Sequence, residues 1–191
     1  DKKTIQYMLD HGVQDAASAP CYRADEDANY CQKLFFKAED LVPTVACPHE
    51  VDNTKPITEV VGQHIDQVYI GSCTGGRLSD LEAAASILKG KKIADGCRLL
   101  ISPASRLVWE QAMRAGLLDT LAASGATILA STCGACLGLH SGTIGKGESC
   151  VSTTNRNFIG RMGSKYGDVY LASAVTAAAT ALEGKLADPR E

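Results

Sequence analysis

The sequence predicts an α/β fold, a three-layer domain in which a mostly parallel sheet carries helices on both faces. Two observations lead to this prediction. From residue 66 onward, short continuous apolar runs alternate with segments of helical periodicity, as in strands that are buried on both faces and joined by helices. Polar, glycine-rich segments directly follow several of these runs, which is where open α/β sheets bind ligands. The length of 191 residues suits about one domain.

The regular part of the chain contains five apolar runs that we interpret as strands. They lie at residues 68–70, 99–101, 127–130, 150–153 and 169–171. Between them, apolar residues recur at three- and four-residue spacing, which is typical of helices. A helix is expected from the cap Ser79 to Gly90, another from Ser102-Pro103 to Gly116, a short one over 117–123, and a final alanine-rich one that ends at Gly184.

The first 65 residues lack this regularity. A helix is expected over 4–9 and a short strand over 34–36, and Pro43, Pro48 and Pro56 interrupt the stretch after it. We therefore predict two parts: residues 1–65, an irregular connector from an amino-terminal portion outside this sequence, and residues 66–191, the α/β domain.

The composition of the chain argues against several classes of function. Lysine and arginine total 19, and aspartate and glutamate total 22, so the net charge of −3 argues against a nucleic-acid partner. No apolar run reaches the ~18 residues of a membrane span, and no export signal is recognised. We expect a cytoplasmic protein whose eight cysteines are reduced thiols rather than a disulfide scaffold.

Three of the cysteines follow predicted strands. Cys73 lies in the loop 71–77, and Cys133 and Cys136 form a C-x-x-C pair after the third strand. Buried structural thiols are one interpretation of such residues, and a zinc site or a redox disulfide is another. Zinc sites commonly use two such pairs, and only one is present. Three cysteines from two loops suit an iron–sulfur cluster that leaves one iron open for Lewis-acid catalysis.

A third segment, 152–161, follows the fourth predicted strand and supplies Asn155, Arg156 and Arg161. Arginine guanidinium groups bind carboxylates or phosphates through paired hydrogen bonds. These residues are therefore candidates for substrate binding, with a solvated surface pair as the alternative.

The order of three motifs resembles the aconitase superfamily. They are Gly-Ser-Cys-Thr at 71–74, Cys-Gly-x-Cys-x-Gly at 133–138, and Thr-Asn-Arg-Asn-Phe-x-Gly-Arg at 154–161. The segment 48–56 also resembles the group of 3-isopropylmalate dehydratase and homoaconitase large subunits. The similarity extends from about residue 3 to 189.

This resemblance implies that Cys73, Cys133 and Cys136 ligate a [4Fe–4S] cluster and that Asn155, Arg156 and Arg161 contact substrate. It implies a hydro-lyase that isomerises 3-isopropylmalate by dehydration and rehydration in leucine biosynthesis, with homoaconitase or dimethylmalate dehydratase as alternatives. A non-catalytic iron–sulfur or zinc-binding module is the alternative of another class.

The resemblance also implies parts that this sequence lacks. The family's large subunits carry an amino-terminal half with further active-site residues, and a small subunit, the swivelling domain, supplies others. The substrate would be a hydroxy di- or tricarboxylate. The resemblance implies that the chain corresponds to the carboxyl-terminal half of a large subunit, and we expect it to be inactive alone. Gly75 stands where the family usually has asparagine.

Overall fold

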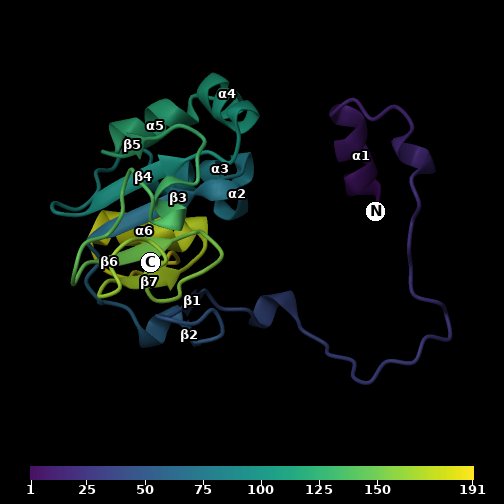
Figure 1. Ribbon diagram of the computed structural model, residues 1–191, viewed down its shortest axis with the longest axis horizontal. Coiled ribbons are helices and arrows are strands. Elements are labelled where there is room, and N and C mark those ends of the chain that lie inside the picture. The colour runs from purple at the N-terminus through teal and green to yellow at the C-terminus, as the bar shows by residue number, and fades with distance from the viewer. The chain divides into compact units, whose positions relative to one another are not determined.

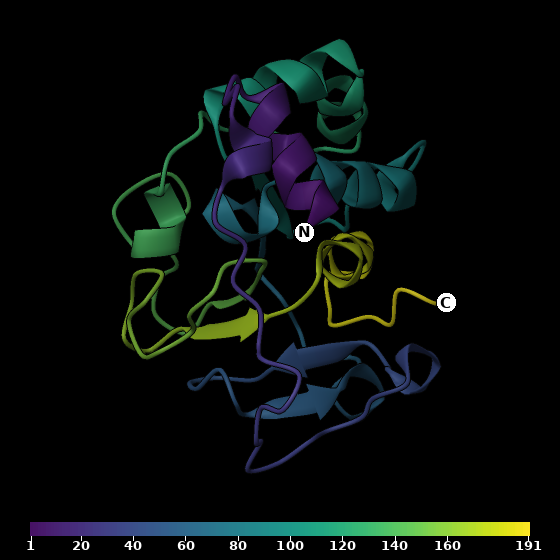
Figure 2. The same cartoon turned by 90° about the vertical axis from the view of Figure 1, so that its right-hand side faces the viewer.

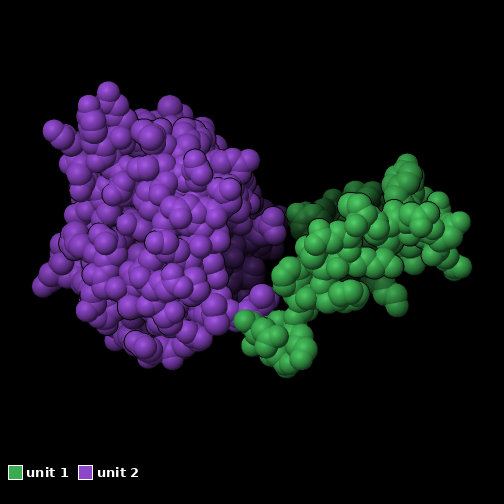
Figure 3. All heavy atoms as spheres, turned by 90° about the horizontal axis from the view of Figure 1, so that it is seen from below, with its two compact units in different colours: residues 1–40 green, residues 41–191 purple.

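The computed structural model describes residues 1–191, which divide into two compact units, 1–40 and 41–191 (Figure 3). The first unit contains only short helices: α1 (Lys2–Asp10), η1 (Ala16–Ser18) and η2 (Ala38–Asp40). The predicted first helix is present, and the Asp1 carboxylate caps it by accepting a hydrogen bond from the Thr4 amide at 2.8 Å. The predicted strand at 34–36 is absent, because no neighbouring strand pairs with it.

The second unit is built on a seven-stranded sheet in the order β2-β1-β7-β6-β3-β4-β5 (Figure 1). Its strands are β1 (Thr44–Ala46), β2 (Thr54–Pro56), β3 (Gln67–Gly71), β4 (Arg98–Ser102), β5 (Thr127–Ile128), β6 (Ser149–Ser152) and β7 (Asp168–Leu171). The five strands from β7 to β5 are parallel, and β1 pairs antiparallel with β2 and with β7. The predicted α/β class with a mostly parallel sheet is confirmed.

The division between units differs from the predicted boundary at residue 65. Residues 41–65 fold with the second unit, because β1 and β2 form a hairpin that extends the sheet next to β7. The helix η3 (Ile57–Glu59) comes next, and its Ile57 is fully buried in the main core. The stretch interpreted as irregular therefore contributes an edge of the sheet.

The two faces of the sheet are covered differently (Figure 2). One face packs Val68, Ile70 and Ile101 against the helices. These are α3 (Leu78–Leu88), α4 (Arg106–Arg114), α5 (Leu117–Ala123) and α6 (Ala174–Glu183). The other face packs Tyr69 and Leu100 beneath the short helix η4 (Gly134–Leu137) and the loops around it. The second covering layer is thus mostly loop.

Two helix starts differ from their predicted positions. Helix α3 begins one residue before Ser79, because the Asp80 carboxylate accepts a hydrogen bond from the backbone N–H of Arg77 at 3.0 Å and so fixes the first turn there. Helix α4 is capped by Ser105 and not by Ser102. The Ser102 hydroxyl is hydrogen-bonded elsewhere, to the carbonyl oxygens of residues 130 and 132 at 3.1 and 3.2 Å.

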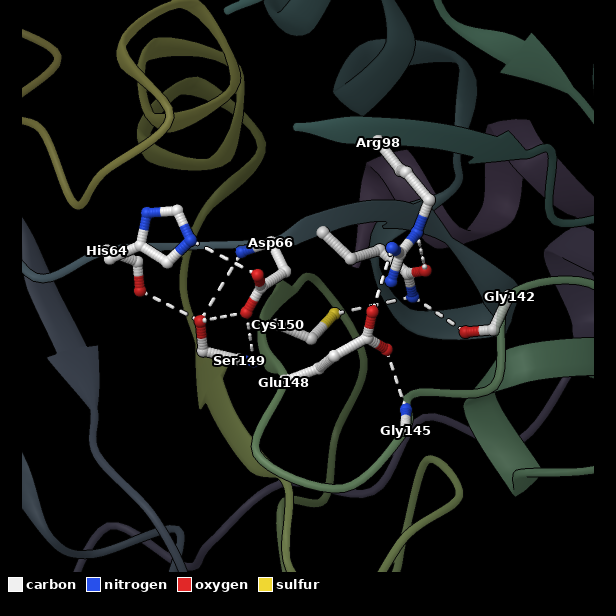
Figure 4. A network of polar contacts seen from close by, with 9 residues as sticks. His64, Asp66, Arg98, Gly142, Gly145, Glu148, Ser149 and Cys150 are labelled. Carbon is white, nitrogen blue, oxygen red and sulfur yellow. Dashed lines mark hydrogen bonds and ion pairs between the residues drawn. The ribbon is translucent and has the colours of Figure 1, made fainter. Parts of the chain in front are cut away.

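A polar network fixes the amino-terminal ends of the parallel strands (Figure 4). The Asp66 carboxylate accepts hydrogen bonds from the Ser149 amide at 2.7 Å and hydroxyl at 3.0 Å, and His64 contacts it at 3.1 Å. Arg98 pairs with Glu148 at 2.9 Å. The backbone N–H of Ser149 lowers the pKa of Asp66, and Arg98 lowers that of Glu148. The contacts of Asp66 with Ser149 join segments that are 83 residues apart in sequence.

No helix of the chain combines the length and the apolar character needed to cross a bilayer.

Candidate functional site

The candidate residues lie at the carboxyl edge of the parallel sheet. Parallel pairing sets Gly71 of β3 beside Ser102 of β4, and Tyr69 of β3 beside Ser152 of β6. The segments with Cys73, Cys133 and Asn155 follow β3, β5 and β6, so they leave the sheet at the same edge. This is the edge where α/β sheets bind ligands.

Cys73 lies in the one-turn helix α2 (Ser72–Gly75), which Thr153 fastens to the sheet. The Thr153 hydroxyl accepts a hydrogen bond from the Gly71 amide at 2.9 Å and donates one to the Gly75 carbonyl at 3.0 Å. The approach is so close that a Cβ atom on Gly75 would lie 2.4 Å from the Thr153 Cβ. The absence of a side chain at position 75 therefore permits this packing.

The Cys73 thiol is exposed. The Ser72 hydroxyl lies 3.8 Å from its sulfur and the Thr74 hydroxyl 3.9 Å. The Ser72 hydroxyl makes the largest contribution to lowering the pKa of Cys73, and the Thr74 hydroxyl adds to it. A thiol with a lowered pKa and an open surface is suited to bind a metal, because the thiolate is the ligand.

Cys133 caps the amino-terminal end of η4, and Cys136 lies within it. Cys133 is exposed, whereas Cys136 is buried beneath the loops. The Arg161 guanidinium donates a hydrogen bond from Nη2 to the Cys136 sulfur at 3.6 Å and stacks on the Phe158 ring at 5.4 Å. Its Nε atom is buried and has no hydrogen-bond partner. Arg161 is thus held inward against the C-x-x-C pair.

Asn155 and Arg156 are exposed on the loop after β6. Arg156 donates a hydrogen bond to the Asn155 carbonyl at 2.7 Å. Neither Arg156 nor Arg161 forms an ion pair with an acidic side chain. Both cations are therefore available to an anionic ligand.

The sequence pattern alone did not single out Asn157, which is buried next to Arg156. Its amide nitrogen donates to the carbonyl of Cys47 at 2.8 Å and to that of Glu50 at 3.3 Å. It thereby ties the loop after β1 to the arginine-bearing segment, and a cavity of about 280 Å³ lies between them, lined by His49 and Arg156 among others. The signal in the sequence that could have identified Asn157 is its position within the third motif.

The structure does not gather a complete ligand set. All eight cysteines are free, and no three histidine, cysteine, aspartate or glutamate side chains lie close enough to hold a metal ion together. The donor chemistry nonetheless fits an iron–sulfur cluster, which cysteine thiolates hold. Cys73 has a lowered pKa, and Cys136 already accepts a hydrogen bond from a cation.

Comparison with known proteins identifies the family. The profile of the aconitase family (aconitate hydratase) matches residues 53–184. The chain belongs to the aconitase family. The predicted resemblance is thereby confirmed.

The family relatives are named as large subunits. The chain is 51% identical over 191 residues to a probable methanogen homoaconitase large subunit of Methanosarcina mazei, covering 100% of the chain and 47% of the relative. It is 52% identical over 169 residues to 3-isopropylmalate dehydratase large subunit 2 of Archaeoglobus fulgidus, covering 88% of the chain and 41% of the relative. For the 3-isopropylmalate dehydratase large subunit of Sulfurihydrogenibium sp. the identity is 51% over 191 residues, 100% of the chain and 44% of the relative. The chain thus spans less than half the length of these relatives.

Within this aconitase-family chain, the three motif segments correspond to three loops at one sheet edge. The loop with Cys73 contacts the segment after β6 through Thr153, and that segment contacts η4 through Arg161. Direct hydrogen bonds therefore link the three loops that carry the motifs.

Proposed function

We propose that the chain is the carboxyl-terminal part of a hydro-lyase large subunit that isomerises 3-isopropylmalate by dehydration and rehydration. The observation that carries the proposal is the match of the chain, at about half identity over 191 residues, to proteins named 3-isopropylmalate dehydratase large subunit. The reaction would belong to leucine biosynthesis, and the protein would be cytoplasmic.

Cys73, Cys133 and Cys136 would hold a [4Fe–4S] cluster in this enzyme. When bound, the cluster would supply an open iron as a Lewis acid for the substrate hydroxyl. The lowered pKa of Cys73 and the cationic hydrogen bond to Cys136 support thiolate ligation at both positions.

Arg156 and Arg161 would bind the carboxylates of a hydroxy di- or tricarboxylate, beside Asn155. Their freedom from ion pairs supports this role, because a guanidinium without a partner can form a forked pair with a carboxylate. The contact of Arg161 with Cys136 supports a substrate position close to the cluster.

The remaining parts of the enzyme would come from elsewhere. The relatives are named large subunits, so a small subunit with a swivelling domain is the proposed partner. Residues 1–40, which form a unit apart from the α/β domain, would connect this part to the amino-terminal half of the subunit. The chain alone is expected to be inactive.

A homoaconitase is the second candidate, because the Methanosarcina mazei relative, identical at 51% of positions, carries that name. A dimethylmalate dehydratase is a third candidate within the same chemistry. A non-catalytic iron–sulfur or zinc-binding module is the alternative from another class.

The test uses the full-length large subunit that contains this chain, reconstituted anaerobically with iron and sulfide and combined with its small subunit. We expect about four iron and four sulfide per chain and turnover of 3-isopropylmalate in preference to homocitrate-type substrates. Zinc retention without iron uptake would favour the zinc module, and a loaded but inactive protein would favour the non-catalytic one.

Two variants separate binding from cluster assembly. Arg156→Lys keeps the charge but loses the fork, so kcat/KM should fall about 10- to 150-fold, equivalent to the roughly 1.5–3 kcal/mol of a charge-assisted hydrogen bond. Iron content should stay normal, because the Arg156 guanidinium donates to the Asn155 carbonyl and not to a candidate cysteine. Cys136→Ser should remove iron and activity together. Wild-type activity in Arg156→Lys would contradict its substrate role.

A further inference from the structure

Tyr69 is the central residue of β3 and lies four positions before Cys73. Its side chain points to the face covered by η4, where it shares a core cluster with Ala135, Cys136 and Met162. The residue is 0% exposed. The phenol ring therefore forms part of the floor beneath the C-x-x-C pair.

The hydroxyl of Tyr69 is buried and makes no hydrogen bond. The neighbouring Ser102 hydroxyl is directed to the carbonyls of Ala130 and Thr132 at 3.1 and 3.2 Å. A buried polar group without a partner is costly to stability. Phenylalanine would fill the same space without that cost, so the hydroxyl calls for a ligand-related explanation.

The Tyr69 ring belongs to the same buried cluster as Cys136 and Cys150, so its hydroxyl is enclosed among thiols. A phenol hydroxyl can donate a hydrogen bond to an acceptor sulfur. A neutral thiol is a weak acceptor, whereas a thiolate accepts hydrogen bonds strongly.

We propose that Tyr69 is a positioning residue whose hydroxyl donates a hydrogen bond to the Cys136 sulfur once that sulfur is a metal-bound thiolate. The inference rests on the proposed function, because it needs metal at the C-x-x-C pair. Arg161 already donates to the same sulfur at 3.6 Å. Together the two donors would hold the buried ligand from the sheet and from the loop after β6. Hydrogen bonds of this kind orient ligands and retain metals.

The proposal makes predictions of opposite sign for the empty and the loaded protein. In the apo full-length large subunit, Tyr69→Phe removes an unpartnered hydroxyl, so its unfolding midpoint should equal or exceed that of the wild type. In the reconstituted subunit, the same variant should release iron to a chelator about 10- to 100-fold faster. A residue that serves packing alone would not produce this pair of results.

Tyr170→Phe is the matched control. Tyr170 is a half-buried tyrosine on β7 that packs against the opposite core cluster. Its variant should release iron at the wild-type rate.

Either of two results in Tyr69→Phe would overturn the inference while the wild type loads iron and sulfide normally. One is iron release at the wild-type rate, and the other is an apo midpoint clearly below the wild type, which would show a hydroxyl already satisfied in the fold. A wild-type subunit that takes up no iron or sulfide would refute the proposed function and the inference with it.

Discussion

Replacement of Gly75 by alanine provides a sharp test of how the Cys73 loop is packed. The new Cβ would lie 2.4 Å from the Thr153 Cβ and hydroxyl oxygen, and 2.5 Å from the Thr153 carbonyl oxygen. A flexible side chain could turn aside, but the carbonyl belongs to the backbone that follows β6. Helix α2 must therefore move away from Thr153.

The cost has two parts. Overpacking of a close-packed site costs about 1–3 kcal/mol. Movement of α2 also weakens the hydrogen bonds of the Thr153 hydroxyl to Gly71 and Gly75, at about 1 kcal/mol each. Gly75→Ala should thus lower the free energy of unfolding by about 3–5 kcal/mol, a large share of the roughly 5–15 kcal/mol typical of a domain.

Urea unfolding followed by far-ultraviolet circular dichroism measures this change, with an unchanged m-value as the sign that both end states are comparable. Gly145→Ala is the control, because its Cβ would meet only the Glu148 side chain, at 3.4 Å. It should change the free energy of unfolding by less than about 0.5 kcal/mol. A similarly small change in Gly75→Ala would refute the packing argument. Gly75→Asn, which adds a larger side chain at the same place, should be at least as destabilising.

Three further outcomes are expected. Asp66 has a folded-state pKa below its unfolded value of about 3.9, so its stabilising contribution is present above that pH and is lost as the pH falls through the folded value. Asp66→Asn should therefore reduce the loss of stability at acidic pH in a profile of unfolding free energy against pH, and an unchanged loss would contradict this. Iodoacetamide should label Cys73, whose pKa is lowered, well before Cys150, because burial raises the pKa of Cys150 to about 12. Peptide mass spectrometry measures the two labelling rates, and equal rates would contradict the structure. Asn157→Asp removes both amide donors to the 47–50 loop and should cost about 1–3 kcal/mol in urea unfolding, whereas a neutral effect would show that this tie is dispensable.

The strands of the parallel sheet could be predicted because burial on both faces leaves a continuous apolar signature. Leu99 and Ile101 face the helices while Leu100 faces η4, so no polar residue interrupts the run. Strand β2 carries no such signature: its sequence Thr-Lys-Pro becomes a strand only through pairing with β1. Local pattern could not predict that pairing.

In the candidate site, too, local sequence pattern predicts some features and not others. The motifs identify the chemistry-bearing residues, because cysteine spacing and arginine type are visible in the sequence. The hydrogen bond between Arg161 and Cys136 joins residues 25 positions apart, and the one between Asn157 and Cys47 joins residues 110 positions apart. Such contacts depend on which loops the sheet brings together, and only the folded chain supplies that information.

The two ends of the sheet bear on the chain's tendency to aggregate. One end is β5, only two residues long, and the other is β2, with an exposed lysine and a proline that has no N–H to donate. Short, charged or proline-bearing edge strands are poor templates for the addition of a strand from another molecule. Despite a core of apolar strands, the unit thus presents no extended open edge on which amyloid-like stacking could begin.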